Sequence, residues 1–437
     1  MRKEDIGDFV RGSYAANPAA TVLLGVIVAM WIFSVVCCLL LGPDSFGYML
    51  YYKRYEYWSD FFNSLVDSYG SPYTVVQVIY PGLAVVMYDA LAHLIIPIAE
   101  DSGLSSDESY AYAVRDTAIG TWTYLLLASA LMVILAYLSY KILKERGFGK
   151  YSPVAAVLVV FSFPFIYSFD RGNIILLSML LTLIFIRWYD SDNKYARWTA
   201  YIAIAAAVGI KIYPAFFLIL LLRNRRVKDF VLCLVLSLAL VFLPIYLTDG
   251  TPADLIRNIL DYSSSNPRKD GIVNISDLVC SIWHGISPDT YKGDLCMTVA
   301  TIATLSFELI GLIVAVWCRN MEKWEVLALI AIMTMLGPGV GTDYLYSYML
   351  IPVLYFMTSE SKDPRRTMFF AICFAATLCM VPGIDIIDFS DVHVNWDTVN
   401  TTMKTMFVFA MAADLLYNGY RRMRGKAKEP VSKPAEN

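Results

Sequence analysis

Residues 58–63 (WSDFFN) place an acid among aromatic side chains, just after the first long apolar run of the chain. A carboxylate at such a place suits a general base, which must lie within hydrogen-bond reach of the proton that it removes. Asp60 is therefore a candidate catalytic base, with Trp58 and Asn63 as candidate substrate contacts. The alternative is a solvated acid on an amphipathic helix, and the residues alone leave both interpretations open.

A second polar segment, residues 170–173 (DRGN), stands between two apolar runs and is predicted to form a tight turn. Glycine permits the turn, because it adopts backbone conformations that other residues avoid. Arg171 either pairs with Asp170 and anchors the turn at the membrane interface or binds a phosphate group through its guanidinium. Asp170 and Asn173 are candidate substrate contacts beside it.

The third segment, residues 209–214 (GIKIYP), places a lysine inside an apolar stretch. An isolated charge in the bilayer costs several kcal/mol, on the order of 3 or more, so Lys211 should have an anionic partner or reach water. Pro214 breaks the helix and frees backbone groups beside the lysine. Both facts predict an anion site at membrane depth, with Tyr213 next to it. In the alternative interpretation Lys211 extends along the helix end to the interface.

Residues 337–348 (GPGVGTDYLYSY) combine glycines, an acid and three tyrosines after a short apolar helix. Glycine allows close approach of the backbone, so Asp343 and Tyr348 are candidate substrate contacts. The tyrosines could equally form an interfacial aromatic belt. Tyr73 and Tyr80, each next to a proline in the segment after Asp60, are further candidates.

These residues must be positioned by membrane helices. The chain has 437 residues, of which 58% are hydrophobic and 17% charged, whereas a soluble domain is about half apolar and a quarter charged. The apolar residues form blocks long enough to cross a hydrocarbon layer of about 30 Å as helices. Backbone groups in lipid must be hydrogen-bonded within the segment. The sequence therefore predicts an all-α polytopic transmembrane bundle of about ten to twelve helices.

Lysine and arginine fall into clusters that alternate with the polar segments described above. One topology places every cluster on the cytoplasmic side, together with both termini. Two long loops, 42–120 and 248–296, are then extracytoplasmic. The clusters are residues 2–11, 141–150, 187–197, 223–228, 319–323, 362–366 and 421–433.

Within this topology, residues 77–97 are expected to form a helix that lies in the interface or is re-entrant, because a full crossing would place the later basic clusters outside. Three regions are predicted: a cytoplasmic segment 1–18, a transmembrane domain 19–420 and a basic tail 421–437. Cys280 and Cys296 share the second outer loop and could form a disulfide if that loop faces an oxidising compartment.

The order of these short motifs resembles glycosyltransferase family 87, within the GT-C superfamily of membrane glycosyltransferases. The resemblance covers residues from about 20 to 420 and extends to the polyprenol-phosphate-mannose-dependent α-mannosyltransferases. It is carried by WSDFFN at 58–63, PY and YP at 72–73 and 80–81, RGN at 171–173, KIYP at 211–214, NIS at 274–276 and DYLYSY at 343–348.

The resemblance implies a bundle of GT-C type, a polyprenyl-phosphate sugar donor, an active site outside the cytoplasm and inversion at the anomeric carbon. The catalytic acid of the family corresponds to Asp60 and its lysine to Lys211; Arg171 would help to hold the donor phosphate. The expected acceptor is a glycolipid or glycan, and the expected location is the plasma membrane. Such a donor carries its own leaving group, so no metal and no cofactor are expected.

Other classes of function remain possible from the sequence. A transporter or flippase for lipid-linked sugars also uses broken helices and a lysine at membrane depth, and a polymerase or ligase of lipid-linked glycans would also use large outer loops. Asp60 favours the enzyme, because a transporter has little need of an acid in an extramembrane loop. The net charge of −3 argues against a nucleic-acid partner, and no cysteine or histidine spacing resembles a metal site.

Overall fold

The computed structural model describes residues 18–41, 56–104, 109–265, 273–287, 293–337, 343–360, 363–379 and 396–425. Every regular element in these ranges is a helix. The all-α polytopic bundle predicted from the sequence is thereby confirmed.

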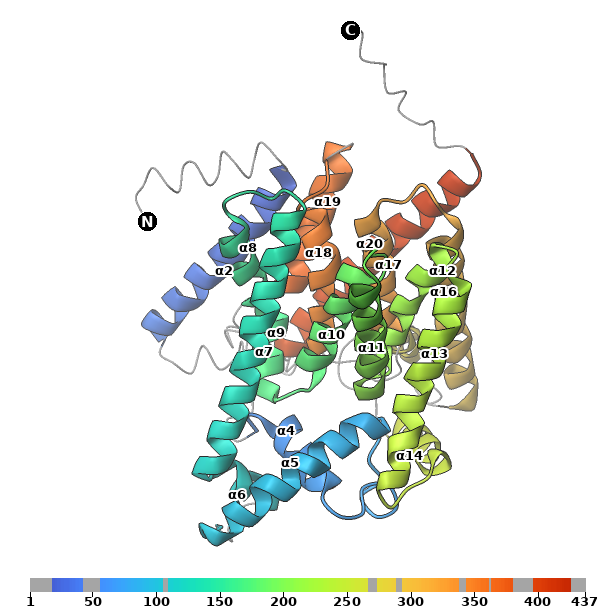
Figure 1. The fold of residues 1–437 in the computed structure, drawn as a ribbon. Coiled ribbons are helices and arrows are strands. Elements are labelled where there is room, and N and C mark those ends of the chain that lie inside the picture. The colour runs from blue at the N-terminus through green and yellow to red at the C-terminus, as the bar shows by residue number, and fades with distance from the viewer. Residues whose placement is uncertain are drawn as a thin grey trace.

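Five of the described helices are long and apolar enough to cross a membrane: α2 (Pro18–Leu41), α5 (Gly82–Asp101), α7 (Ala118–Glu145), α13 (Val227–Phe242, continued by the 3₁₀ helix η2, Leu243–Leu247) and α16 (Asp294–Trp317). Their apolar side chains face outward along much of their length, which suits contact with lipid. In Figure 1, α7 runs along the left side of the bundle and α13 along its right side.

Several predicted helices are broken rather than continuous. The expected helix 152–169 is two pieces, α8 (Ser152–Val160) and α9 (Phe163–Arg171), bent by 50°. Pro164 explains the break, since its ring prevents the helix from continuing. Shorter helices complete the bundle: α10 (Ile175–Trp188), α11 (Lys194–Ile210), η1 (Tyr213–Leu218), α12 (Ile219–Arg223), α17 (Lys323–Leu336), η4 (Asp343–Met349), α18 (Leu350–Phe356), α19 (Pro364–Leu378) and α20 (Trp396–Met423).

The two long polar segments predicted as outer loops contain helices of their own. The first holds α4 (Ser59–Ser68), α5 and α6 (Tyr110–Asp116), and the second holds α14 (Pro252–Ser265) and α15 (Ile275–Ile286). In Figure 1, α4, α5, α6 and α14 form a layer at one end of the bundle. Although α5 is long enough to span, it lies across the ends of the other helices there, an orientation that favours the predicted interfacial position.

The described basic clusters meet at the opposite end of the bundle. Arg187 pairs with Glu145, Lys323 lies 3.6 Å from Asp190, and Arg223 donates to the carbonyl groups of Ala315 and Cys318 at 2.7 and 2.8 Å. The Pro18 end of α2 and the Met423 end of α20 lie at this end too (Figure 1). A common side for these clusters agrees with the predicted topology; that this side is cytoplasmic stays a prediction.

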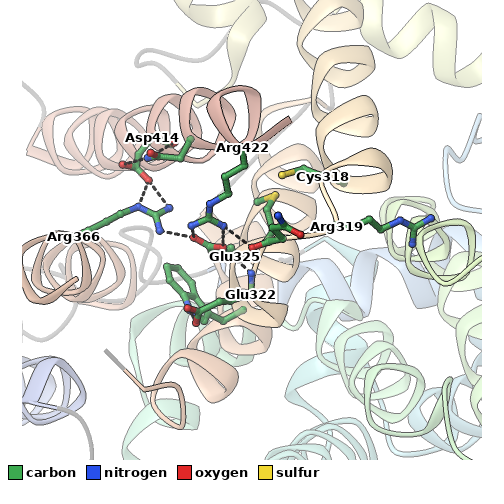
Figure 2. Close-up of polar contacts among 12 residues, drawn as sticks. Cys318, Arg319, Glu322, Glu325, Arg366, Asp414 and Arg422 are labelled. Carbon is green, nitrogen blue, oxygen red and sulfur yellow. Dashed lines mark hydrogen bonds and ion pairs between the residues drawn. The ribbon is translucent and has the colours of Figure 1, made fainter. Parts of the chain in front are cut away.

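A buried carboxylate joins three of the helices at the basic end. Glu325, in the first turn of α17, is only 1% exposed and receives ion pairs from Arg366 of α19 and Arg422 of α20, the latter at 2.6 Å. Figure 2 shows Glu325 between the two arginines, with Asp414 of α20 on the far side of Arg366 at 2.7 Å. Glu325 also accepts the backbone N–H of Glu322 at 2.7 Å and so caps its own helix.

Some sequence predictions fall on residues that the structure does not describe. These are the basic residues of segment 1–17 and of the tail beyond 425, Lys362, the glycine-rich residues 338–342 and Val381, the predicted end of the helix after Thr367. The division into a cytoplasmic segment, a transmembrane domain and a tail therefore stays a prediction.

The two cysteines of the second outer segment contact each other as thiols. The Sγ atoms of Cys280 and Cys296 lie 3.1 Å apart, in a small cluster between α15 and α16 where both residues are buried. The sequence expectation that the pair lies within reach of a disulfide is compatible with this contact.

We predict that Glu325→Gln strongly lowers stability. Two guanidinium groups that are each about a fifth exposed would lose the charge between them, and removal of one partner of a buried ion pair costs on the order of 3 kcal/mol. The apparent melting temperature of the purified protein in detergent measures the effect. The control is Asp190→Asn, which removes a solvated partner of Lys323 and should change stability by less than about 1 kcal/mol. Equal melting temperatures for the two variants would contradict the proposed role of Glu325.

Candidate active site

The turn after α9 and the start of α4 fit closely together. Gly172 ends α9 in the left-handed conformation, with φ of +71°, and a Cβ there would lie 2.9 Å from the Cβ of Phe61 and 3.0 Å from the Cα of Trp58. Trp58 is itself left-handed, with φ of +57°, and its backbone N–H donates to the carbonyl oxygen of Asp170 at 2.6 Å. Only glycine satisfies both the conformation and the space at position 172.

This contact brings both oxygens of the Asp60 carboxylate to the turn. Arg171 donates to Oδ1 at 2.6 Å, and the Asn173 amide donates to Oδ2 at 2.7 Å. The orientation of the amide is fixed, because Oδ1 of Asn173 accepts the backbone N–H of Ile175 at 3.0 Å and leaves the NH₂ group to face Asp60. The structure therefore brings Asp60 to Arg171 and Asn173, which follow it by 111 and 113 residues in the chain.

Lys211 lies where α11 ends. Its backbone is extended, with φ of −142°, and the chain resumes as η1 with Pro214 in its first turn. The side chain is 8% exposed. Among the described residues its ammonium contacts aromatic faces rather than a carboxylate, with Nζ 4.4 Å from the ring centre of Tyr80 and 5.4 Å from that of Tyr344. Ring faces stabilise a cation only modestly, so the charge remains available to an anion.

Tyr80 connects the lysine to the carboxylate. Its ring contacts Lys211, and burial together with the negative charge of Asp60 raises the pKa of its hydroxyl, an effect that Arg171 opposes. Tyr80 therefore stays a neutral phenol that can donate or accept a hydrogen bond. The three charged groups and Tyr80 form one site, which we call the Asp60–Lys211 site.

Further tyrosines surround this site. Tyr213, half-buried in the first turn of η1, interacts electrostatically with Tyr80, Tyr348 and Tyr262. Tyr348 is fully buried, and its hydroxyl lies 3.2 Å from that of Ser178 on α10. Tyr262 belongs to α14 and places the second outer segment beside the site; sequence reasoning did not identify it.

Tyr73 has a positioning role. It is 1% exposed, and its hydroxyl donates to the backbone carbonyl of Tyr80 at 3.0 Å. Asp249 accepts the backbone N–H of Tyr73 at 3.2 Å, and Asn258 donates to its carbonyl at 3.0 Å. The predicted role of Tyr73 as a direct substrate contact is thus less favoured than a role in fixing Tyr80.

The remaining candidates lie around the site in different ways. Asn63 is exposed on α4, and Trp58 packs its ring 4.8 Å from that of Tyr124. Asp343, 7% exposed, points toward α20, where Thr401 donates to its carboxylate at 3.0 Å. Substrate contact by these residues stays a prediction.

A second buried lysine was missed by sequence reasoning. Lys404, in the first third of α20, is 2% exposed, and its Nζ lies 3.5 Å from the ring centre of Phe163 and 5.8 Å from that of Tyr346. It lies one turn from Thr401, which donates to the carboxylate of Asp343. The signal was present in the sequence, since a lysine stands within the apolar run 403–412, but the helix was interpreted only as a span.

The chemistry that this arrangement supports is acid–base and electrostatic. Asp60 can accept a proton, while Arg171 and Lys211 can stabilise negative charge that develops between them. Within the described ranges, no three histidine, cysteine or acidic side chains gather as metal ligands.

A carboxylate and two cations that all interact with Tyr80 are compatible with group-transfer chemistry. Comparison with known families defines the class: the model of glycosyltransferase family 87 matches residues 110–338, more than half of the chain. The chain belongs to glycosyltransferase family 87 and is a membrane glycosyltransferase. The match includes Arg171, Asn173 and Lys211, whereas Asp60 precedes it. No curated protein matches the chain.

We predict that Gly172→Ala lowers the rate of sugar transfer by on the order of 10²-fold, the scale of a misplacement of about 1 Å at a catalytic site. The new methyl group would push Trp58 and Phe61 away and separate Asp60 from Arg171. Gly149→Ala is a matched control, since Gly149 also has a positive φ, +84°, but has no atom near its missing Cβ. If the two variants lose the same fraction of activity, the close fit of α4 to the turn has no catalytic importance.

Proposed function

We propose that this membrane glycosyltransferase transfers mannose from a polyprenyl-phosphate donor to a glycolipid or glycan acceptor. The reaction would take place on the extracytoplasmic face of the plasma membrane, with both termini in the cytoplasm. A transporter or flippase for lipid-linked sugars would not by itself require a glycosyltransferase family match, so we favour the enzyme.

The buried ammonium of Lys211 is the observation that supports this donor. A cation with 8% exposure and no carboxylate partner among the described residues pays a desolvation penalty that a bound anion would offset. The lysine lies at the break between α11 and η1, where the bundle meets the first predicted outer segment through Tyr80. A polyprenyl phosphate has both a negative charge for Lys211 and a chain that can lie in the bilayer beside the bundle.

The proposed reaction is a single displacement. Asp60 would take the proton of the acceptor hydroxyl while its oxygen bonds to the anomeric carbon, and the bond from that carbon to the phosphate oxygen breaks. The configuration inverts, and the polyprenyl phosphate leaves with both electrons of the broken bond. Its charge grows from one to two during the step, so Lys211 and Arg171 would bind the transition state more tightly than the donor.

Arg171 would serve two groups in this account. One of its nitrogen atoms holds Oδ1 of Asp60 at 2.6 Å, and another lies 3.8 Å from Glu56, a distance too long for a strong hydrogen bond. A guanidinium has five N–H donors in a planar fork, a geometry that matches a phosphate as well as a carboxylate. Asn173 would keep the carboxylate oriented while Arg171 shares its donors.

The Asp60→Asn variant tests the base. It preserves the shape of the side chain and removes the proton acceptor, so we predict a loss of turnover on the order of 10²-fold or more, with unchanged donor binding. The assay is transfer from radiolabelled polyprenyl-phosphate mannose by the purified enzyme. Asp294→Asn, at an exposed carboxylate in the first turn of α16, should behave as wild type. Near-normal turnover of Asp60→Asn would move the role of base to another carboxylate, with Asp67 on the same helix the first to examine.

The Lys211→Met variant tests the phosphate contact, because methionine keeps a flexible apolar stem and removes the charge. We predict that kcat/KM falls by ~10- to 10³-fold, or about 1.4–4 kcal/mol, while the protein still inserts and folds. Lys211→Arg should recover part of the loss if charge dominates.

The control for Lys211 is Lys323→Met, at a lysine that also lies over two tyrosine rings, at 5.2 and 5.0 Å, but at the basic end of the bundle. Its kcat/KM should not change. A fully active Lys211→Met enzyme would show that Lys211 only extends toward water, and the phosphate contact would then fall to Arg171 alone.

A further inference from the structure

A pocket of about 360 Å³ opens in the outer layer, away from the Asp60–Lys211 site. Its walls come from the end of α4, the middle of α5 and the segment after η2, and the side chains that give it its chemistry are Ser68, Tyr69, Asp89, His93, Thr248 and Asp249. The volume is within the range of small-ligand sites, and no part of the mechanism above uses it.

The side chains of the pocket suit a neutral ligand rich in hydroxyl groups. The hydroxyls of Ser68, Tyr69 and Thr248 and the ring of His93 can donate or accept, while the carboxylates of Asp89 and Asp249 accept. None of the described residues that line the pocket is a lysine or an arginine, and two carboxylates would repel a phosphate. A hydrocarbon chain would leave these polar groups unsatisfied.

The walls are held in place before any ligand binds. Nδ1 of His93 lies 3.2 Å from Oδ1 of Asp89, and its ring meets that of Tyr69 edge-on, with centres 4.8 Å apart. Asp249 accepts the backbone N–H groups of Tyr73 and Thr74, both at 3.2 Å. Tyr69 remains 40% exposed, so it presents a flat surface on which a sugar ring can stack.

The pocket is connected to Asp60 by the helix that carries both. From Asp60 to Ser68 the axis of α4 rises by about 12 Å. Asn63 and Asp67 follow Asp60 by three and seven residues, spacings that place all three on one side of a helix. The pocket itself is lined by Ser68 and Tyr69 at the end of the helix, so one sugar is too short to occupy both the pocket and the carboxylate.

We propose that this pocket binds a neutral sugar unit of the acceptor, a few units away from the hydroxyl that reacts at Asp60. The inference rests on the proposed function and specifies its substrate class. The preferred acceptor would already carry several sugars, so the enzyme would extend a preformed oligosaccharide rather than add the first sugar to a lipid.

The test compares two synthetic acceptors, octyl mannoside and the octyl glycoside of mannotetraose, with the full-length enzyme in nanodiscs and polyprenyl-phosphate mannose as donor. Tyr69→Ala and Asp89→Asn should raise KM for the long acceptor about tenfold, the scale of one or two lost hydrogen bonds, and leave kcat unchanged. Neither variant should alter transfer to octyl mannoside. Asp101→Asn, an exposed change at the end of α5, is the control.

A second measurement does not depend on transfer. Saturation-transfer NMR with free mannotetraose should detect binding to the wild-type protein and to Asp60→Asn, and weaker binding to Tyr69→Ala. The pocket proposal is overturned if wild type shows equal KM for both acceptors, or if the variants match wild type with the long one. A third outcome separates the two proposals. If mannotetraose binds and the binding requires Tyr69, but neither acceptor receives a sugar, the proposed function is contradicted and the pocket proposal is not.

Discussion

The organisation of the end of the bundle opposite the basic clusters depends on the burial of the Lys211 charge. The ammonium lies 4.4 Å from the Tyr80 ring and 5.4 Å from the Tyr344 ring, and these residues come from segments far apart in the chain. Tyr80 is held by Tyr73 from the first outer segment, and Tyr344 belongs to η4 after α17. A charge in this position is expensive without an anion, so the arrangement is best explained by a ligand that supplies one. The folded protein tolerates the free-energy cost of this buried charge because the surrounding helices fix the backbone on both sides of the break.

The opposite end of the bundle shows how the same protein treats a buried charge that has only a structural role. Glu325 is enclosed by Arg366, Arg422 and the capped end of its own helix, so every part of the carboxylate is satisfied. Lys211 receives no such compensation among the described residues. The charge of Glu325 therefore joins helices, whereas the charge of Lys211 is the one that we propose binds a substrate. Since Glu325 lies in the first turn of α17 and α17 leads toward η4, rigid placement at the basic end supports the position of Tyr344 at the other.

Much of this architecture followed from sequence, because spans, breaks and turns are local properties. The apolar runs, the break at Lys211 and Pro214 and the turn at Gly172 were all predicted near their observed positions. The pairing of Asp60 with Asn173 was not, since it depends on how α4 packs against α9 across more than 100 residues. Lys404 was missed because an isolated lysine in an apolar helix was attributed to a span. Tyr73 was predicted to contact substrate, but its burial and hydrogen bonds, visible only in three dimensions, favour a positioning role.

The central claim is that a lipid-linked sugar phosphate, held at Lys211, is the donor. The most direct measurement offers the purified enzyme in nanodiscs two radiolabelled donors in separate reactions, polyprenyl-phosphate mannose and the nucleotide-linked sugar, each with the same glycan acceptor. If Lys211 holds a lipid-linked donor, labelled product should form from the lipid donor alone. Added polyprenyl monophosphate, which shares the charge and chain of the donor, should inhibit the reaction, whereas neutral polyprenol should not. Transfer from the nucleotide-linked sugar, or equal inhibition by polyprenol, would contradict the central claim.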